Sequence, residues 1–236
     1  MTIKATKILR SLAKPIRKLT NRPYREACAA LKAMRKDGIV RRRYEHPLLN
    51  SGSVVFDLGG FQGEWTDGIF VRYHPTIHVF EPHPKFAQLL QEKYARNTKI
   101  QVHECALASA DGTFELHDLG DGSSAHRTNG QTFLCKAVEA RAFLGYLGVR
   151  RIDLMKLNIE GGEYEILPHL SAIGMVPNIR VFQVQFHLLS KESIPARNRI
   201  RAMFAKTHQI DWCYDFVWEQ WSLLGDPLAT TPVNME

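Results

Sequence analysis

From about residue 50 onward, the chain alternates short apolar runs with stretches of helical periodicity. The apolar runs lie at 53–57, 77–81, 100–104, 152–158 and 180–187, and the helical stretches lie at 63–73, 84–96, 137–147, 162–170 and 194–206. Alternation of strand and helix predicts a mainly parallel sheet covered by helices. Residues 113–117 predict a short extra strand, 120–130 a loop rich in Gly, Ser and Asn, and 208–224 two antiparallel strands. We therefore expect one α/β domain over residues 51–236.

The first 50 residues have a different character. Apolar residues at helical spacing predict helices over 1–20 and 23–36, and the Asn50–Gly52 turn marks a boundary before the α/β domain. This segment holds 14 Lys and Arg against 3 Asp and Glu, whereas the remainder holds 17 against 21. The net charge of +7 therefore belongs to a basic helical extension over residues 1–50.

A basic extension meets an anionic partner or an acidic face of its own fold. A membrane surface fits because cationic amphipathic helices lie on anionic lipid. An arm of a homodimer, or a cover over a binding site, fits equally well. RNA ranks third because the basic residues are not interleaved with aromatic ones, so nucleic acid is disfavoured as a partner.

Composition disfavours several classes of protein. No run of about 18 apolar residues is present, so nothing is expected to span a bilayer. The N-terminus lacks the apolar segment of a signal peptide. The 4 cysteines are far apart and form no C-x-x-C pair, which disfavours zinc and a disulfide framework. We expect a cytoplasmic location, peripheral at the inner membrane surface if the extension meets lipid.

The strongest chemical signal follows the first strand of the domain, in the run V-V-F-D-L-G-G-F-Q-G at 54–63. Asp57 ends the strand, and Gly59 and Gly63 form a turn that opens a helix. Glycines let a ligand approach the backbone closely, and a helix N-terminus offers N–H groups to a carboxylate. Phe61 stands where dinucleotide dehydrogenases need a second glycine, so the spacing differs from theirs. A plain structural turn is the alternative.

Acids end the next two predicted strands. Glu81 lies 24 residues after Asp57, where α/β nucleotide folds place an acid that binds ribose. A carboxylate can accept charge-assisted hydrogen bonds from both ribose hydroxyls. Glu104 ends the third predicted strand and would border an adenine; an ordinary surface acid is the alternative.

A third group of polar residues lies at the end of the strand over 152–158. Lys156, Asn158 and Glu160 occupy alternate positions, which face one side of a strand. Polar groups on a buried strand must be paired or must contact a ligand. A salt-bridged strand end is the alternative to a ligand site.

Together these motifs resemble the FkbM-type methyltransferase family, from about residue 53 to 170 and more weakly to 187. The resemblance rests on Phe56-Asp57-Leu58-Gly59…Gly63, on Val79-Phe80-Glu81-Pro82, on Glu104-Cys105-Ala106-Leu107 with Gly112, and on Asp153…Lys156…Glu160-Gly161…Glu163. It implies a Rossmann-like class I methyltransferase fold, with a mainly parallel seven-stranded sheet and an antiparallel C-terminal strand. It also implies S-adenosylmethionine as methyl donor and O-methylation of a sugar or glycan hydroxyl. The residues implied in cofactor binding are Asp57, Gly59, Gly63, Glu81, Glu104 and Asn158.

Two positions depart from the family pattern. Asn158 stands where relatives commonly carry an aspartate, and Gln185 stands where a glutamate often precedes the histidine. Hard divalent cations such as Mg²⁺ prefer carboxylate oxygens, so we predict no metal. The same changes leave open a rival hypothesis, a cofactor-binding but inactive partner in a glycan-modifying complex.

A hydroxyl acceptor needs a base, and three residues are candidates. His187 ranks first because its ordinary pKa of about 6.5 suits proton transfer, although a structural histidine is the alternative. Glu160 and Lys156 are the others, and Lys156 would act only if burial lowered its pKa. The loop 120–130 is either a substrate lid or a plain connection.

Overall fold

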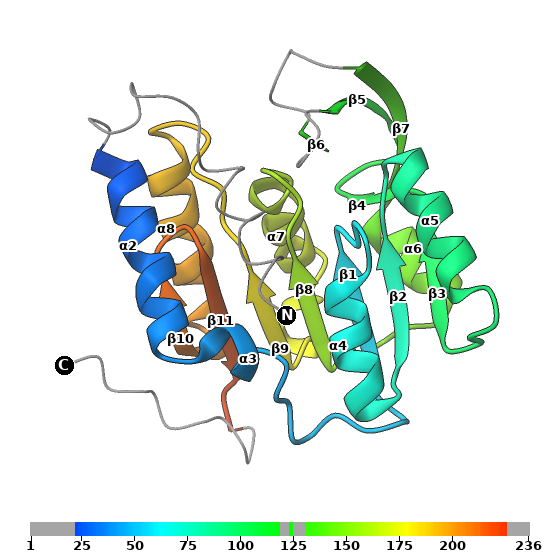
Figure 1. The fold of residues 1–236 in the computed structure, drawn as a ribbon, viewed down its shortest axis with the longest axis horizontal. Helices are drawn as coiled ribbons and strands as arrows, with labels where there is room; N and C mark the ends of the chain where they lie inside the picture. Colours follow the sequence, from blue (N-terminus) through cyan, green and yellow to red (C-terminus); the bar gives the residue numbers. More distant parts are fainter. Residues whose placement is uncertain (1–21, 119–122, 125–130, 226–236) are drawn as a thin grey trace.

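The structure is a computed structural model that describes residues 22–118, 123–124 and 131–225 (Figure 1). The helix predicted over 1–20 and most of the loop predicted over 120–130 lie outside the described residues. Among the described helices, none is long and apolar enough to cross a membrane.

The described chain is built around a sheet with the strand order β10-β11-β9-β8-β1-β2-β3. The strands are β1 (Val54–Leu58), β2 (Thr76–Phe80), β3 (Ile100–His103), β8 (Leu154–Leu157), β9 (Val181–Val184), β10 (His208–Tyr214) and β11 (Trp218–Leu223). Neighbouring strands pair in parallel from β3 through β9, whereas β11 runs antiparallel to both β9 and β10. The predicted seven-stranded, mainly parallel sheet with an antiparallel C-terminal strand is confirmed.

Helices cover both faces of this sheet, and this explains why its central strands β1, β2, β8 and β9 are buried along almost their whole length. They are α4 (Glu64–Tyr73), α5 (Pro84–Tyr94), α6 (Ala140–Leu147), α7 (Glu163–Ala172) and α8 (Ser193–Phe204), and a short 3₁₀ turn, η2 (Val176–Asn178), precedes β9. Along β1, Val55 shares a buried cluster with Trp65 of α4, whereas Phe56 shares another with Leu144 of α6 and Ile166 of α7. Successive side chains of β1 therefore pack into two separate hydrophobic cores, one on each face of the sheet.

A second, smaller sheet has the order β4-β7-β5-β6, and Figure 1 shows its β5 and β7 rising above the large sheet. Its strands are β4 (Ala106–Ala108), β5 (Gly112–Asp118), β6 (Ser123–Ser124) and β7 (Gln131–Glu139). The predicted strand over 113–117 is confirmed, and the helix predicted over about 137–147 is confirmed as α6, but its start at 137 was wrong. Residues 131–137 pair antiparallel with β5, and residues 137–139 pair in parallel with β4. The Glu139 carboxylate accepts from the N–H groups of Arg141 and Ala142, so α6 begins only after this cap.

Residues 22–50 fold onto the C-terminal hairpin. They form α2 (Arg22–Lys36) and α3 (Ile39–Arg42), which lie beside β10 and β11 in Figure 1. Leu31, Met34 and Ile39 are buried with Tyr214, Val217 and Trp218, and Tyr214 Oη donates to Asp37 Oδ2 at 2.7 Å. The basic segment is therefore held to the α/β domain by an apolar face, and these C-terminal aromatic rings serve the core.

The parallel strands all end at one edge of the large sheet, which is the upper edge in Figure 1. In open α/β sheets, ligands bind outside the carboxyl ends of the strands, near the point where the strand order reverses. That point lies between β1 and β8, which are neighbours in the sheet although 95 residues separate their ends. The loops after β1, β2, β8 and β9 are therefore where a site is expected.

Candidate active site

A buried ion pair joins β1 to β8 beneath this edge. Asp57 and Lys156 are register partners, and Lys156 Nζ lies 2.8 Å from Asp57 Oδ1. Thr66 Oγ1 of α4 donates to Asp57 Oδ2 at 2.6 Å, and Lys156 Nζ also donates to the Gly59 carbonyl at 2.7 Å. The Lys156 and Asp57 side chains are 5% and 0% exposed, so the protein itself satisfies both charges. In this arrangement both residues position the loop after β1.

The glycines of that loop are required by the protein's own packing. Gly59 and Gly63 have φ angles of 86° and 78°, in the region that favours glycine. A Cβ on Gly59 would lie 2.1 Å from the Asn158 carbonyl oxygen, and one on Gly63 would lie 2.3 Å from Tyr94 Oη. The helix that follows, α4, has no side-chain hydrogen bond at its N-cap. Its first-turn N–H groups are therefore suited to a ligand carboxylate.

Glu81 links the loop after β1 to the loop after β2. It comes directly after β2, is 6% exposed, and accepts from Phe61 N at 2.8 Å and from His83 N at 3.0 Å. Burial raises the pKa of Glu81, while the two N–H groups and the charge of Lys156 oppose this rise. Each carboxylate oxygen has two lone pairs, so these bonds leave acceptor capacity for ligand hydroxyls.

The other two residues predicted to bind a cofactor have different surroundings. Glu104 is exposed and, like Glu81, comes directly after its strand, because β3 ends at His103, one residue earlier than predicted. Asn158 directly follows β8, and its Oδ1 is buried with no hydrogen-bond partner among the described residues. An unsatisfied buried acceptor costs roughly 1–3 kcal/mol, so a ligand N–H group at this position would be stabilised.

A second electrostatic cluster joins the loops after β8 and β9. His187 Nδ1 lies 3.0 Å from Glu163 Oε1, and His187 Nε2 lies 3.4 Å from Glu160 Oε1. Glu163 Oε1 also accepts from the His187 backbone N–H, and its Oε2 accepts from Gly161 N, both at 2.8 Å. The side chains of Glu160, His187 and Glu163 are 38%, 12% and 0% exposed. Glu163 therefore holds His187 from below, and Glu160 is the member that faces outward.

The protonation of His187 changes the ranking of the candidate bases. Burial lowers the pKa of His187, but its hydrogen bonds and ion pairs with Glu160 and Glu163 outweigh burial and raise it to about 10. His187 therefore carries its proton at neutral pH and cannot accept another. The ordinary pKa on which its first rank rested does not apply here, and Glu160 becomes the leading candidate. Glu163 was within the recognised motif, but its contact with His187 depends on tertiary structure.

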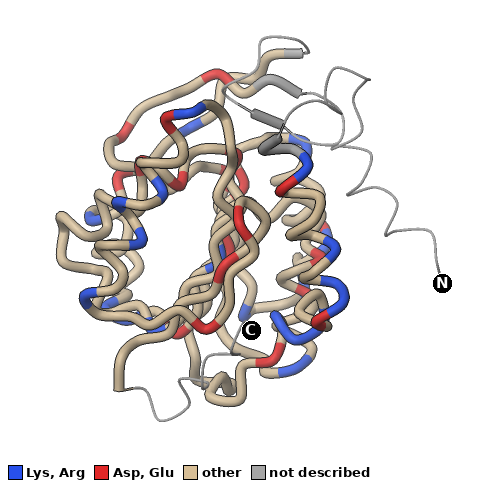
Figure 2. The backbone as a smooth tube through the Cα atoms, turned by 90° about the vertical axis from the view of Figure 1, so that its left-hand side faces the viewer, with Lys and Arg blue, Asp and Glu red and all other residues tan. Residues whose placement is uncertain are grey.

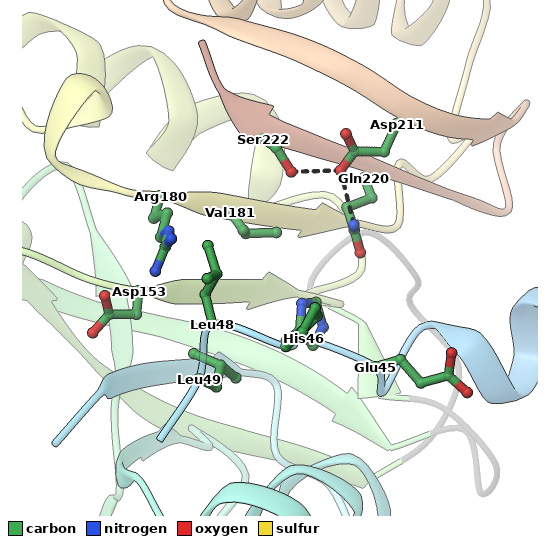
Figure 3. Close-up of a pocket in the computed structure, with 11 residues that line it drawn as sticks. Glu45, His46, Leu48, Leu49, Asp153, Arg180, Val181, Asp211, Gln220 and Ser222 are labelled. Carbon is green, nitrogen blue, oxygen red and sulfur yellow. Dashed lines mark hydrogen bonds between the residues drawn. The ribbon is translucent and has the colours of Figure 1, made fainter. Parts of the chain in front are cut away.

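A small, partly open pocket lies elsewhere. It is lined by Asp153 and Arg180, which precede β8 and β9, and by the segment 45–49 (Figure 3). It is therefore at the opposite edge of the sheet from the candidate site. Figure 3 shows Asp211 bonded to its neighbours: its Oδ2 accepts from Ser222 Oγ at 2.5 Å and from Gln220 Nε2 at 2.8 Å. These hydrogen bonds within the protein indicate a structural role.

The fold and the edge at which the site lies define the class of protein. A mainly parallel seven-stranded sheet, with an antiparallel strand inserted between β9 and β10, is the Rossmann-like fold of class I methyltransferases. A model of the Methyltransferase FkbM domain matches residues 57–211. The chain belongs to the FkbM methyltransferase family.

Solved structures give a more distant comparison. The 23S rRNA methyltransferase ErmE is 12% identical with a TM-score of 0.42, over 81% of this chain and 69% of that chain. The METTL16 MTase domain is 11% identical with a TM-score of 0.46, over 77% and 64%. The Methanococcus jannaschii fibrillarin pre-rRNA processing protein is 11% identical with a TM-score of 0.43, over 77% and 71%. Similarity this low says nothing about the acceptor, and a sequence search of curated proteins found no match.

Substitution of Lys156 tests whether the ion pair organises the site. In Lys156→Met, Asp57 keeps a buried charge without its partner, and we expect a loss of about 3–5 kcal/mol in the free energy of unfolding. In the double variant Asp57→Asn/Lys156→Met, most of this loss should be recovered because no charge remains and Thr66 keeps an acceptor. Urea denaturation measures both. Equal stability of Lys156→Met and the wild type would contradict the structural role of the ion pair. A folded double variant that methylates at the normal rate would exclude Lys156 from catalysis.

The raised pKa of His187 predicts how stability depends on pH. A folded-state pKa of about 10 against an ordinary 6.5 gives a stabilisation that is complete below pH 6.5 and is lost as pH rises toward 10. The difference in unfolding free energy between the wild type and His187→Gln should therefore narrow from pH 7 to 10. Taking the difference cancels the titration of groups common to both proteins. A difference in unfolding free energy that stays constant or increases from pH 7 to 10 would show that His187 is not protonated in the folded protein.

Proposed function

We propose that the protein is an S-adenosylmethionine-dependent O-methyltransferase that acts on a hydroxyl of a sugar or glycan. Membership of the family supports methyl transfer, and the edge formed by the loops after β1, β2, β8 and β9 supports a cofactor site beside an acceptor site. The observation that carries the proposal is the outward Glu160 carboxylate, fixed by a protonated His187 that Glu163 anchors. A cytoplasmic location, with peripheral contact at a membrane, belongs to the same proposal.

The residues present fit S-adenosylmethionine. The unpartnered Oδ1 of Asn158 suits an N–H donor such as the ammonium of the methionine part, and the first turn of α4 suits its carboxylate. Glu81 suits the two ribose hydroxyls, since its acceptor capacity exceeds the two backbone bonds that it accepts. The exposed Glu104 remains a proposed neighbour of the adenine. Asp57, Gly59 and Gly63 would hold the loop in shape for these contacts.

When bound, S-adenosylmethionine supplies a methyl carbon activated by the neighbouring sulfonium. The protein's own residues must orient the acceptor hydroxyl and remove its proton. Glu160 would take that proton, and a positioned base of this kind contributes roughly 10²–10⁴ in rate. His187 would act as a positioning residue, because its Nε2 lies 3.4 Å from Glu160 Oε1 while Glu163 fixes its ring.

The rival hypothesis is a cofactor-binding but inactive partner of a glycan-modifying complex, and the amides Asn158 and Gln185 favour it. These two residues directly follow β8 and β9, which are neighbours in the sheet. Turnover by the natural sequence would eliminate this rival. Methyl transfer from labelled donor to a panel of activated sugars, glycolipids and RNA, with and without EDTA, tests acceptor and metal together. We predict transfer to a sugar-bearing acceptor that EDTA does not reduce.

Calorimetry with S-adenosylmethionine tests the ribose contact. We expect Glu81→Gln to weaken binding roughly 100-fold, because the side chain loses its charge and one of its acceptor oxygens is replaced by an NH₂ group. Glu92→Gln is the matched control, since Glu92 is an exposed acid near the end of α5, and the affinity of this variant should equal that of the wild type. Unaltered binding by a folded Glu81→Gln protein would remove Glu81 from the cofactor site.

Substitution of Glu160 tests the base. We expect Glu160→Gln to lower kcat by about 10²–10⁴ while the affinity for S-adenosylmethionine stays unchanged. Glu165→Gln is the control, because Glu165 lies in the first turn of α7, close to Glu160 in the chain, and accepts hydrogen bonds from Ser109 instead. If Glu160→Gln kept full kcat, the proton would have to leave by another route.

A further inference from the structure

The outer face of α2 carries a stripe of basic residues. Arg25, Lys32 and Lys36 are spaced by seven and four residues, so they share one helical face, and all three are exposed. Leu31 and Met34 face the opposite way and are buried against the C-terminal hairpin. The apolar face of α2 is therefore already used by the fold, and the basic stripe is what the helix presents outward.

Neighbouring residues enlarge this stripe into a basic surface. Its members are the exposed cations Arg25, Lys32, Arg35, Lys36, Arg41 and Arg42 of α2 and α3. Within the same described stretch, Asp37 is held by the Tyr214 hydroxyl. Figure 2 shows blue segments of Lys and Arg along the right-hand side of the chain trace, in addition to others on its left-hand side. This concentration of charge is not needed to bury the helix, so it requires a different explanation.

We propose that this basic surface of α2 and α3 binds the anionic surface of a lipid bilayer. The apolar face of α2 is buried, so the described helix cannot insert among acyl chains, and the contact must depend on charge. Exposed Val40 (43% exposed), beside Arg41 and Arg42, is suited to the interfacial layer. Phosphate groups in a plane match cations spread along the outside of a helix.

The aromatic rings near this surface favour lipid over RNA. Proteins that bind single-stranded RNA offer exposed rings on which bases stack. Trp218 is 8% exposed, and the Arg43 guanidinium lies 5.0 Å from both its ring and that of Tyr44. These rings are thus already covered by a cation of the protein. The inference does not depend on the proposed methyl transfer, because its test measures binding alone.

The position of α2 would place a bound bilayer close to the candidate active site. Figure 1 shows that α2 begins at the level of the edge where the parallel strands end, which is also the edge of Glu160 and Glu81. A bilayer held against α2 would therefore lie beside the opening through which an acceptor reaches the site. Acceptors attached to lipid would then be concentrated at this edge.

Sedimentation of the full-length protein with vesicles tests the proposal. We expect binding to vesicles of phosphatidylcholine mixed with phosphatidylglycerol, weaker binding as salt increases, and none to phosphatidylcholine alone. The variant Arg25→Glu/Lys32→Glu/Lys36→Glu should lower the partition coefficient at least about 100-fold, since each basic residue contributes about fivefold. The control Arg96→Glu/Arg141→Glu/Arg150→Glu changes the net charge equally, through exposed residues on the α5 and α6 side of the molecule. It should keep most of the binding.

Three results would overturn the proposal. Undiminished vesicle binding by the α2 variant would assign the contact to another part of the chain. Equal losses of binding in the α2 variant and the control would show that only the net charge of the protein matters. Binding of single-stranded or duplex RNA that the α2 variant abolishes, without vesicle binding by the wild type, would identify a nucleic-acid surface instead. Circular dichroism of each variant establishes that it is folded, because all six substituted residues are exposed.

Discussion

The site depends on the buried ion pair between Asp57 and Lys156. A carboxylate that is 0% exposed is tolerated only because an ammonium and the Thr66 hydroxyl meet it, and the ammonium is tolerated because the carboxylate and the Gly59 carbonyl accept its protons. These contacts tie β1, β8, α4 and the glycine loop into one unit. The shape of the loop that faces the cofactor is therefore set by electrostatics beneath it, and not by the glycines alone.

Buried charges also determine the shape of the loop that follows β8. Glu160 has a φ angle of 50° and is followed by Gly161 at 114°, so the chain turns sharply directly after the strand. The buried Glu163 holds this turn through the Gly161 N–H and holds the end of β9 through His187. Lys156 and Glu160 lie only four residues apart, yet one supports the loop of the proposed cofactor side and the other faces the proposed acceptor side.

Sequence reasoning recovered the features that local pattern encodes. Continuous apolar runs and glycine turns predicted the parallel strands, and the spacing from Asp57 drew attention to Glu81, whose ribose contact stays a prediction. Sequence reasoning failed where long-range contacts decide. Residues 137–139, predicted as the start of a helix, end a strand because β4 pairs with them. Likewise, the protonated state of His187 comes from two carboxylates that are 24 and 27 residues away in the chain.

The charge at this edge gives a physical reason for the two amides. Asp57, Glu81, Glu160 and Glu163 contribute carboxyl groups, while Lys156 and His187 contribute cations, each held by at least one of those acids. This excess of acid suits the positive sulfonium of the proposed donor. Two further acids in place of Asn158 and Gln185, at the ends of neighbouring strands, would add repulsion that a divalent cation relieves. With amides there, no such repulsion arises, which is the physical reason for our prediction that the proposed acceptor side needs no metal ion.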